Sequence, residues 1–133
     1  MAHRVVLAVS LLALAAAACT QAAAAPSERT VHIRIHYSAY SIGNLDVEPG
    51  QTVRFVISNT DPIDHEFIVG DESVQVAHEL GTEAYHPPRP GEVTIRSGET
   101  VETTYTFGDR DLLFGCHLPG HYAYGMRGTI TVV

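Results

Sequence analysis

The chain has 133 residues and a formal net charge of −7, and its cationic side chains other than histidine are all arginines, with no lysine. This length predicts one compact domain. An acidic chain without a cluster of basic residues has no patch for nucleic acid or anionic lipid, so we expect no nucleic-acid partner.

Residues 1–18 have the pattern of a signal peptide. A short basic start precedes an apolar run from Val5 to Ala18, which is too short to span a bilayer easily. Removing this segment takes away Arg4 and no acidic residue, so the formal charge moves from −7 to −8. We therefore expect an exported protein that works in the periplasm or elsewhere outside the cytoplasm.

The cleavage site has more than one interpretation. The segment before Cys19 resembles a lipoprotein site, at which Cys19 would be lipidated and would provide the only attachment to a membrane. Ordinary small-residue cleavage sites continue to about residue 25, and an uncleaved anchor is a third alternative. We predict a flexible tether over residues 19–30 and a folded domain over residues 31–133.

Short segments of alternating apolar and polar residues follow the tether. Residues 31–37 and 53–57 have the pattern of half-buried strands, with Tyr37 on the buried side of the first. Further strands are predicted at residues 67–69, 93–95, 101–107, 112–116 and 129–133. One short helix is predicted after Asp71 as N-cap, ending before Gly81. We therefore expect an all-β fold, a Greek-key antiparallel β-sandwich of seven or eight strands with one short helix.

The segment from Cys116 to Met126 carries a thiol, an imidazole and a thioether on one loop between two predicted strands. Pro119 and Gly120 force a turn, so Cys116 and His121 can converge on one point. Soft sulfur ligands with imidazole suit copper, and two His with one Cys and a weak axial Met form electron-transfer copper sites. Zinc is disfavoured, because its closed sites are richer in Cys and a thioether is a poor ligand for it.

His65 is the best candidate for the second imidazole, because it opens a predicted strand at the end of the sandwich where loops gather. Cys116 would otherwise be a lone thiol in an oxidising compartment, since Cys19 is either lipidated or removed. The expected metal ligands are thus His65, Cys116, His121 and Met126, with one copper as cofactor. Four protein ligands leave no open position for a substrate, so we do not expect an enzyme.

These residues resemble a known ligand set. The Cys-x4-His-x4-Met loop from Cys116 to Met126, with His65 upstream, is similar to the copper site of the cupredoxins, the family of plastocyanin, azurin and auracyanin. The resemblance covers the whole mature domain, and the loop is most similar to that of auracyanin. It implies a cupredoxin fold with copper at His65, Cys116, His121 and Met126.

The residue after His65 departs from the electron-carrying cupredoxins, which usually have Asn there to help hold the Cys loop. This chain has Glu66. The segment from His65 to Gly70, followed by further His and Glu residues, resembles instead the cupredoxins linked to bacterial copper tolerance. A carboxylate that faces the copper would favour its oxidised state and lower its reduction potential, which is a hypothesis.

Four other polar residues have two interpretations each. His117, next to a ligand, is expected to point away from the metal, either into solvent or as an exit route for the electron. His78, Glu79 and His86 are either ordinary polar residues of a helix and a loop or, with Glu83 or Glu66, a second and weaker copper site.

Two functions are consistent with the sequence. The complete four-ligand set favours a monomeric electron carrier that exchanges one electron with redox partner proteins. Glu66 and the additional His and Glu residues favour a copper-tolerance protein that sequesters copper or hands it on. A structural relic without metal is contradicted by the retained set of four ligands.

Overall fold

The computed structural model describes residues 28–81 and 87–133. The expected signal peptide, most of the tether, Cys19, Glu83 and His86 lie outside the described residues, so the expectations for them stay predictions. The first strand begins at Arg29, two residues before the expected start of the domain, because Arg29 and Thr30 already pair with the neighbouring strand.

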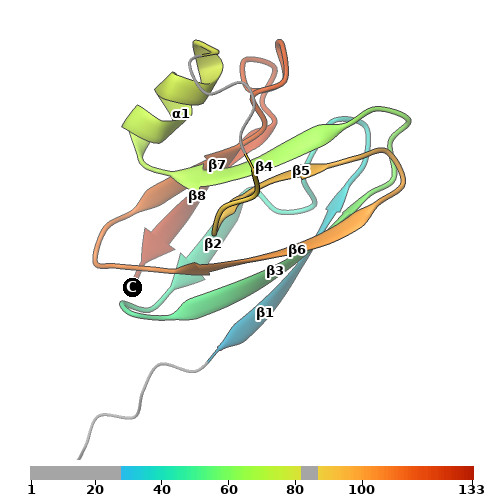
Figure 1. Ribbon diagram of the computed structural model, residues 1–133. Helices are drawn as coiled ribbons and strands as arrows, with labels where there is room; N and C mark the ends of the chain where they lie inside the picture. The colour runs from blue at the N-terminus through green and yellow to red at the C-terminus, as the bar shows by residue number, and fades with distance from the viewer. Residues whose placement is uncertain (1–27, 82–86) are drawn as a thin grey trace, which may run out of the picture.

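Eight strands of the described residues form two sheets that pack face to face (Figure 1). The three-stranded sheet has the order β1 (Arg29–Ile35), β3 (Thr52–Asn59) and β6 (Thr100–Thr106). The five-stranded sheet has the order β2 (Asn44–Val47), β8 (Arg127–Val132), β7 (Leu112–Gly115), β4 (His65–Gly70) and β5 (Glu92–Ile95). This confirms the expected all-β sandwich.

Two of the strand pairings are parallel, so the expectation of a purely antiparallel sandwich was wrong in this respect. β1 pairs with β3 in parallel, and β2 pairs with β8 in parallel. The chain between β1 and β3 passes through β2 in the other sheet, and such a long crossover can return the chain in its original direction. β2 was not predicted as a strand, because it alternates the apolar Leu45 and Val47 with Asn44 and Asp46, two residue types that are depleted in strands.

The core lies between the two sheets and follows the predicted alternation. Val53, Phe55 and Ile57 of β3 are fully buried. Phe67 lies with its ring centroid 5.0 Å from that of Phe55 and 5.4 Å from that of Phe114, so aromatic rings link the two sheets. Burial of each Phe side chain stabilises the fold by about 1.5–3 kcal/mol. The strands thus form a rigid support for the loops at their ends.

Helix α1 (Glu72–Glu79) packs against β4 and β7 (Figure 1). The carboxylate of Asp71 accepts the N–H of Val74 at 3.1 Å, and Gly81 follows the helix with a φ of 70°, as the sequence predicted. No helix in the described part of the chain is long and apolar enough to cross a membrane.

The end of β1 differs from the prediction. The strand stops at Ile35, and Tyr37, expected on the buried face, is 85% exposed. Tyr37 and Ser38 have φ angles of 53° and 52°, a left-handed conformation that is uncommon outside glycine. Both of their N–H groups donate to the carboxylate of Asp61 at 2.7 Å. These side-chain hydrogen bonds replace the strand ladder and turn the chain.

Candidate metal centre

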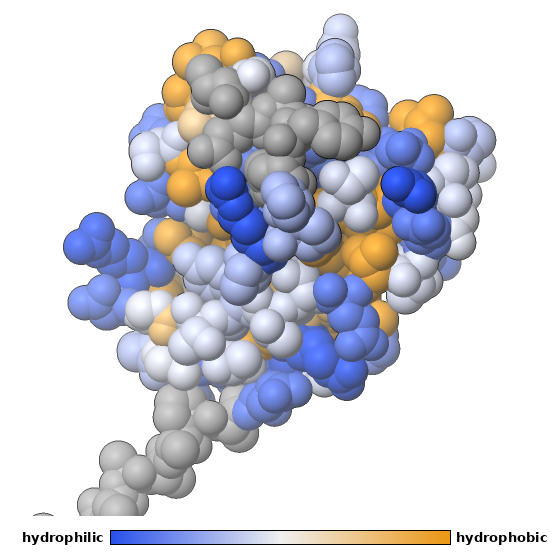
Figure 2. Space-filling view, in the orientation of Figure 1, coloured by the Kyte–Doolittle hydropathy of each residue, from blue (hydrophilic) through white to orange (hydrophobic). Residues whose placement is uncertain are grey.

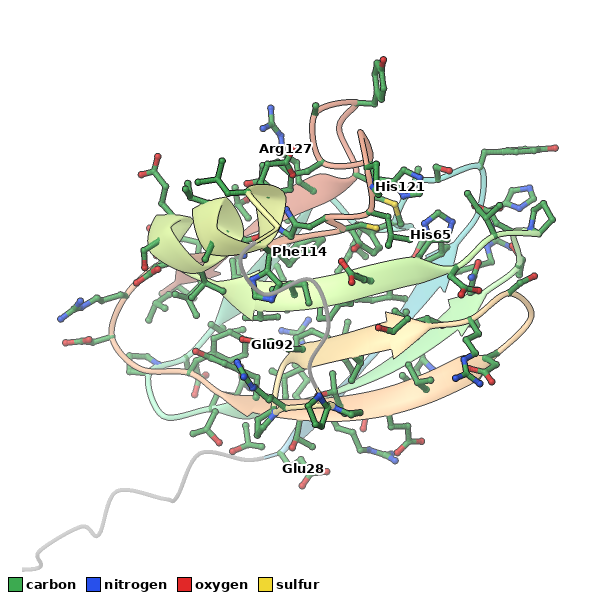
Figure 3. All side chains as sticks on the ribbon, turned by 45° about the horizontal axis from the view of Figure 1, so that its top comes forward. Glu28, His65, Glu92, Phe114, His121 and Arg127 are labelled. Carbon is green, nitrogen blue, oxygen red and sulfur yellow. The ribbon has the colours of Figure 1, made fainter. Side chains whose placement is uncertain are left out.

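Three ligand atoms converge at one end of the sandwich. Cys116 Sγ lies 3.3 Å from His121 Nδ1 and 4.0 Å from His65 Nδ1. All three atoms lie within 4.8 Å of one another, and no other three His, Cys, Asp or Glu residues do so within residues 28–81 and 87–133. Figure 3 shows the rings of His65 and His121 close together beside the loop ends, with centroids 5.0 Å apart. The predicted convergence of these three side chains is confirmed.

The two sheet strands that carry the ligands are adjacent. His65 is the first residue of β4, and Cys116 directly follows β7, which pairs with β4. The side chains of His65 and Cys116 are fully buried, whereas His121 is partly exposed. The site is therefore closed toward the core and reaches the surface at His121.

Backbone hydrogen bonds close the ligand loop. The N–H of Cys116 donates to the carbonyl of Met126, and the N–H of Met126 donates to the carbonyl of His121, both at 3.0 Å. Gly120 and Gly125 have φ angles of 86° and 101°, which the turn requires and a side chain would disfavour. Met126 is 2% exposed, so its thioether is buried within the core beside this loop. Its role as axial ligand stays a prediction.

Glu66, directly after His65, helps to hold the ligand loop. Its N–H donates to Cys116 Sγ at 3.3 Å, and its carboxylate oxygen Oε2 accepts the N–H of His117 at 3.2 Å. Its carbonyl accepts the hydroxyl of Tyr40. The carboxylate thus lies beside the backbone of the residue next to Cys116. The hypothesis of a lowered potential stays a prediction.

His117 is not exposed, so the solvent interpretation of this residue was wrong. Its side chain is only 2% exposed. Nε2 lies 2.8 Å from Oε1 of Gln75, Nδ1 lies 3.0 Å from Oε2 of Glu79, and the ring stacks on Tyr122 with centroids 4.5 Å apart. A buried imidazole needs a hydrogen-bond partner for each nitrogen, and helix α1 supplies both of them.

Among the described residues, His78 and Glu79 belong to no group of three metal-ligating side chains. Nδ1 of His78 lies 2.9 Å from the carbonyl of Val74 in its own helix, and Nε2 lies 3.9 Å from Glu92. Glu79 instead contacts His117. A second copper site at these residues stays a prediction, because His86 and Glu83 lie outside the described residues.

Two residues with contacts to the site were missed from the sequence. Asp61, 6% exposed, places Oδ2 3.0 Å from Nε2 of His65. Gln75 is buried in α1, and Nε2 of its side chain donates to the carbonyl of Ile68 at 3.2 Å. Asp61 could have been found as a carboxylate four residues before a ligand, since metal-bound His usually has an acceptor at its other nitrogen. An isolated Gln in a short helix gives no such indication.

Burial changes the proton affinities of the site. It raises the pKa of the Cys116 thiol to about 11, which the N–H groups of Glu66 and Leu118 only partly oppose. Burial lowers the pKa of His65, although its hydrogen bond with Asp61 acts in the other direction. Burial would raise the pKa of Asp61, but the N–H groups of Ser38, Tyr37 and His65 outweigh it and lower that pKa.

The donor set fits copper. A buried thiol, two imidazoles and a nearby buried thioether are soft or intermediate ligands, which suit copper and not a hard cation such as Mg²⁺ or Ca²⁺. The thiol would lose its proton on binding the metal.

Curated relatives of this chain are copper proteins. The chain is 36% identical over 91 residues to the copper-resistant cuproprotein CopI of Vibrio cholerae, covering 65% of this chain and 54% of the relative. It is 32% identical to CopI of Rubrivivax gelatinosus, covering 82% of this chain and 69% of the relative. The chain thus spans about half of the Vibrio protein and about two thirds of the Rubrivivax protein.

Solved structures with the same fold include auracyanins. Auracyanin B is 25% identical with a TM-score of 0.65, covering 81% of this chain and 90% of that structure. Auracyanin of the photosynthetic bacterium Roseiflexus castenholzii is 26% identical with a TM-score of 0.66, covering 81% of this chain and 98% of that structure.

The family assignment rests on the whole described domain. A sequence profile of copper-binding proteins of the plastocyanin/azurin family matches residues 28–133. The fold, the convergent His65, Cys116 and His121, and the relatives agree with it. The chain therefore belongs to the plastocyanin/azurin family of copper-binding proteins, and copper is its cofactor.

Proposed function

We propose that this protein binds one copper at His65, Cys116, His121 and Met126 as a type 1 (blue) site and transfers one electron at a time. The observation that carries the proposal is the convergence of one thiol and two imidazole nitrogens within 4.8 Å, with Cys116 and His65 buried. Bound copper would supply a Cu(II)/Cu(I) couple at this point.

The residues of the chain have distinct tasks in this proposal. His65 and His121 present their Nδ1 atoms to the thiolate of Cys116, and the N–H of Glu66 donates to its sulfur. The two sheet strands and the hydrogen-bonded loop hold these groups in one arrangement. Little rearrangement between oxidation states favours rapid electron transfer.

A second candidate function is copper tolerance, in which the protein sequesters copper or hands it on. Relatives in Vibrio and Rubrivivax are described as copper-resistant cuproproteins. Glu66 at the position after His65 supports the same role. The two functions are compatible at one site, because a copper that cycles between oxidation states can also serve copper tolerance.

The location and partners are part of the proposal. We expect the protein to be exported to the periplasm or another extracytoplasmic location, as a monomer without enzymatic activity, with Cys19 as a candidate lipid anchor. The face seen in Figure 2 is mainly hydrophilic, with hydrophobic residues in separate small areas. Three large apolar side chains are exposed on the loops near the ligands, namely Tyr37, Ile63 and Tyr124. These loops suit the approach of a redox partner to His121.

A copper titration of the mature domain tests the site. We expect one copper per chain, a strong visible thiolate-to-copper band and rapid electron self-exchange. Cys116→Ser should abolish the band, whereas His32→Ala, an exposed residue of β1, should leave it unchanged. A coloured Cys116→Ser protein would contradict the ligand assignment.

Deletion of the gene separates the two functions. Loss of copper tolerance without a respiratory defect would favour the second function, as would a stoichiometry above one copper. A respiratory or other electron-transport defect at low copper would favour the carrier.

A further inference from the structure

Asp61 connects three N–H donors to one buried carboxylate. Oδ1 accepts the N–H of Tyr37, and Oδ2 accepts the N–H of Ser38, both at 2.7 Å. Oδ2 also lies 3.0 Å from Nε2 of His65. The N–H of Asp61 donates to Oδ1 of Asn59 at 3.0 Å, which fixes the backbone under the carboxylate. Hydrogen bonds within the protein therefore hold both the carboxylate and the backbone of Asp61.

The contact with His65 determines which nitrogen of the ring is available. A carboxylate only accepts hydrogen bonds when ionised, so a proton on Nε2 is satisfied by Asp61 and a proton on Nδ1 would leave two acceptors facing each other. The ring of His65 is fully buried, so solvent cannot replace Asp61. With the proton on Nε2, Nδ1 directs its lone pair toward the space beside Cys116 Sγ.

The other acidic residues nearby have different partners. Asp64 is exposed, and its Oδ1 accepts the N–H of Ser97 at 2.9 Å. Glu66 acts on the Cys116 side of the site, through the N–H of His117. Among the described residues, Asp61 is thus the carboxylate that lies within hydrogen-bond distance of a ligand imidazole.

We propose that Asp61 is a positioning residue of the copper site, which holds the proton of His65 on Nε2 and whose negative charge stabilises Cu(II) relative to Cu(I). This inference rests on His65 as a copper ligand, as in the proposed function. Partners of this kind orient metal-bound His and increase its basicity, and their removal typically lowers metal affinity about 10- to 100-fold.

A purely structural role makes a different prediction. If Asp61 served only to hold the turn at Tyr37 and Ser38, its loss would weaken binding of Cu(II) and Cu(I) equally. The reduction potential depends on the ratio of the two affinities and would not change. The potential therefore distinguishes the two roles.

Asp61→Asn is the test variant, and Asp64→Asn is its matched control. Asn keeps the shape of the side chain but has one oxygen, so it cannot accept from Tyr37, Ser38 and His65 in the present arrangement. We expect Asp61→Asn to lower the Cu(II) affinity by about 10- to 100-fold and the Cu(I) affinity by less. The potential should rise by about 59 mV for each tenfold difference between these losses. Asp64→Asn should change the Cu(II) affinity and the reduction potential by much less.

Equal losses of Cu(I) and Cu(II) affinity in Asp61→Asn, or a potential no higher than that of Asp64→Asn, would overturn the charge role. If Asp61→Asn does not fold, the wild-type protein provides a direct measurement. Long-range ¹H–¹⁵N correlation spectra of the metal-free protein should show His65 with its proton on Nε2 at neutral pH. A proton on Nδ1 would overturn the positioning role.

The same samples separate this inference from the proposed function. The ligand assignment itself would be refuted if the wild-type protein bound no copper, or if the Cys116→Ser protein were still coloured. A normal wild-type site with an unchanged potential in Asp61→Asn would refute only the role of Asp61.

Discussion

The N–H of Glu66 lies 3.3 Å from the sulfur of Cys116, and the carboxylate of Glu66 accepts the N–H of His117 at 3.2 Å. One residue of β4 therefore contacts the ligand thiol and the residue after it. Hydrogen bonds to a thiolate sulfur tune the potential of a copper site. The backbone contribution is independent of the side chain, whereas the carboxylate adds a negative charge that a neutral side chain at this position would not.

Glu66→Gln should raise the reduction potential. Gln can still accept the N–H of His117 but lacks the charge that favours Cu(II). Glu66 is partly exposed, so we expect an increase of about 40 mV, the equivalent of roughly 1 kcal/mol for one electron. Glu79→Gln is the matched control, because Glu79 contacts the ring of His117 from the helix. No increase in Glu66→Gln in direct electrochemistry, or an equal increase in the control, would contradict the assigned role.

Gly115→Ala should destabilise the fold and disturb the ligand loop. A Cβ at Gly115 would lie 2.5 Å from two ring atoms of Tyr122 and 3.2 Å from Oε1 of Gln75. The ring of Tyr122 cannot move freely, since it stacks on His117. We expect a loss of about 1–3 kcal/mol in the free energy of unfolding, measured with urea. Gly108→Ala, where nothing lies within 4 Å, should cost much less. Similar midpoints for the two variants would refute this packing argument.

The sequence predicted most of this architecture because its strong patterns are local. Alternation and short apolar runs gave seven of the strands, and the spacing from Cys116 to Met126 gave the ligand loop. β2 was missed because two of its four residues are Asn and Asp, which are depleted in strands. The parallel pairings and the partners of His117 depend on contacts between distant segments.

Asp61 shows the same limit at the site. Its hydrogen bonds reach Tyr37 and Ser38 after the end of β1, which lie 24 and 23 positions before it in the chain. The left-handed turn at Tyr37 is stabilised by that distant carboxylate, so a pattern of alternation extended the strand too far. Local propensity could not indicate this turn.

The metal-free protein should lose stability at alkaline pH through Cys116. Its pKa of about 11 in the folded state lies above the ordinary value of 9.0. Stability is thus fully present below about pH 9 and is lost as the pH rises toward 11, because the unfolded thiol releases its proton first. The loss should approach about 2–3 kcal/mol. Urea unfolding of wild type and Cys116→Ser at about pH 7 and about pH 10 measures about half of this loss as a difference between the two proteins. The same pH dependence in both proteins would exclude Cys116 as its source.

Met126→Leu should raise the reduction potential and keep the thiolate-to-copper band. The band arises from Cys116, whereas the axial thioether tunes the potential by donating to the more positive oxidised copper. Residue 126 is buried and Leu has nearly the volume of Met, so the substitution should lower the free energy of unfolding by less than about 1.5 kcal/mol. The backbone bonds of Met126 to Cys116 and His121 do not involve its side chain and should persist. A potential equal to that of the wild type, with the band retained, would show that Met126 fills the core without ligating the metal.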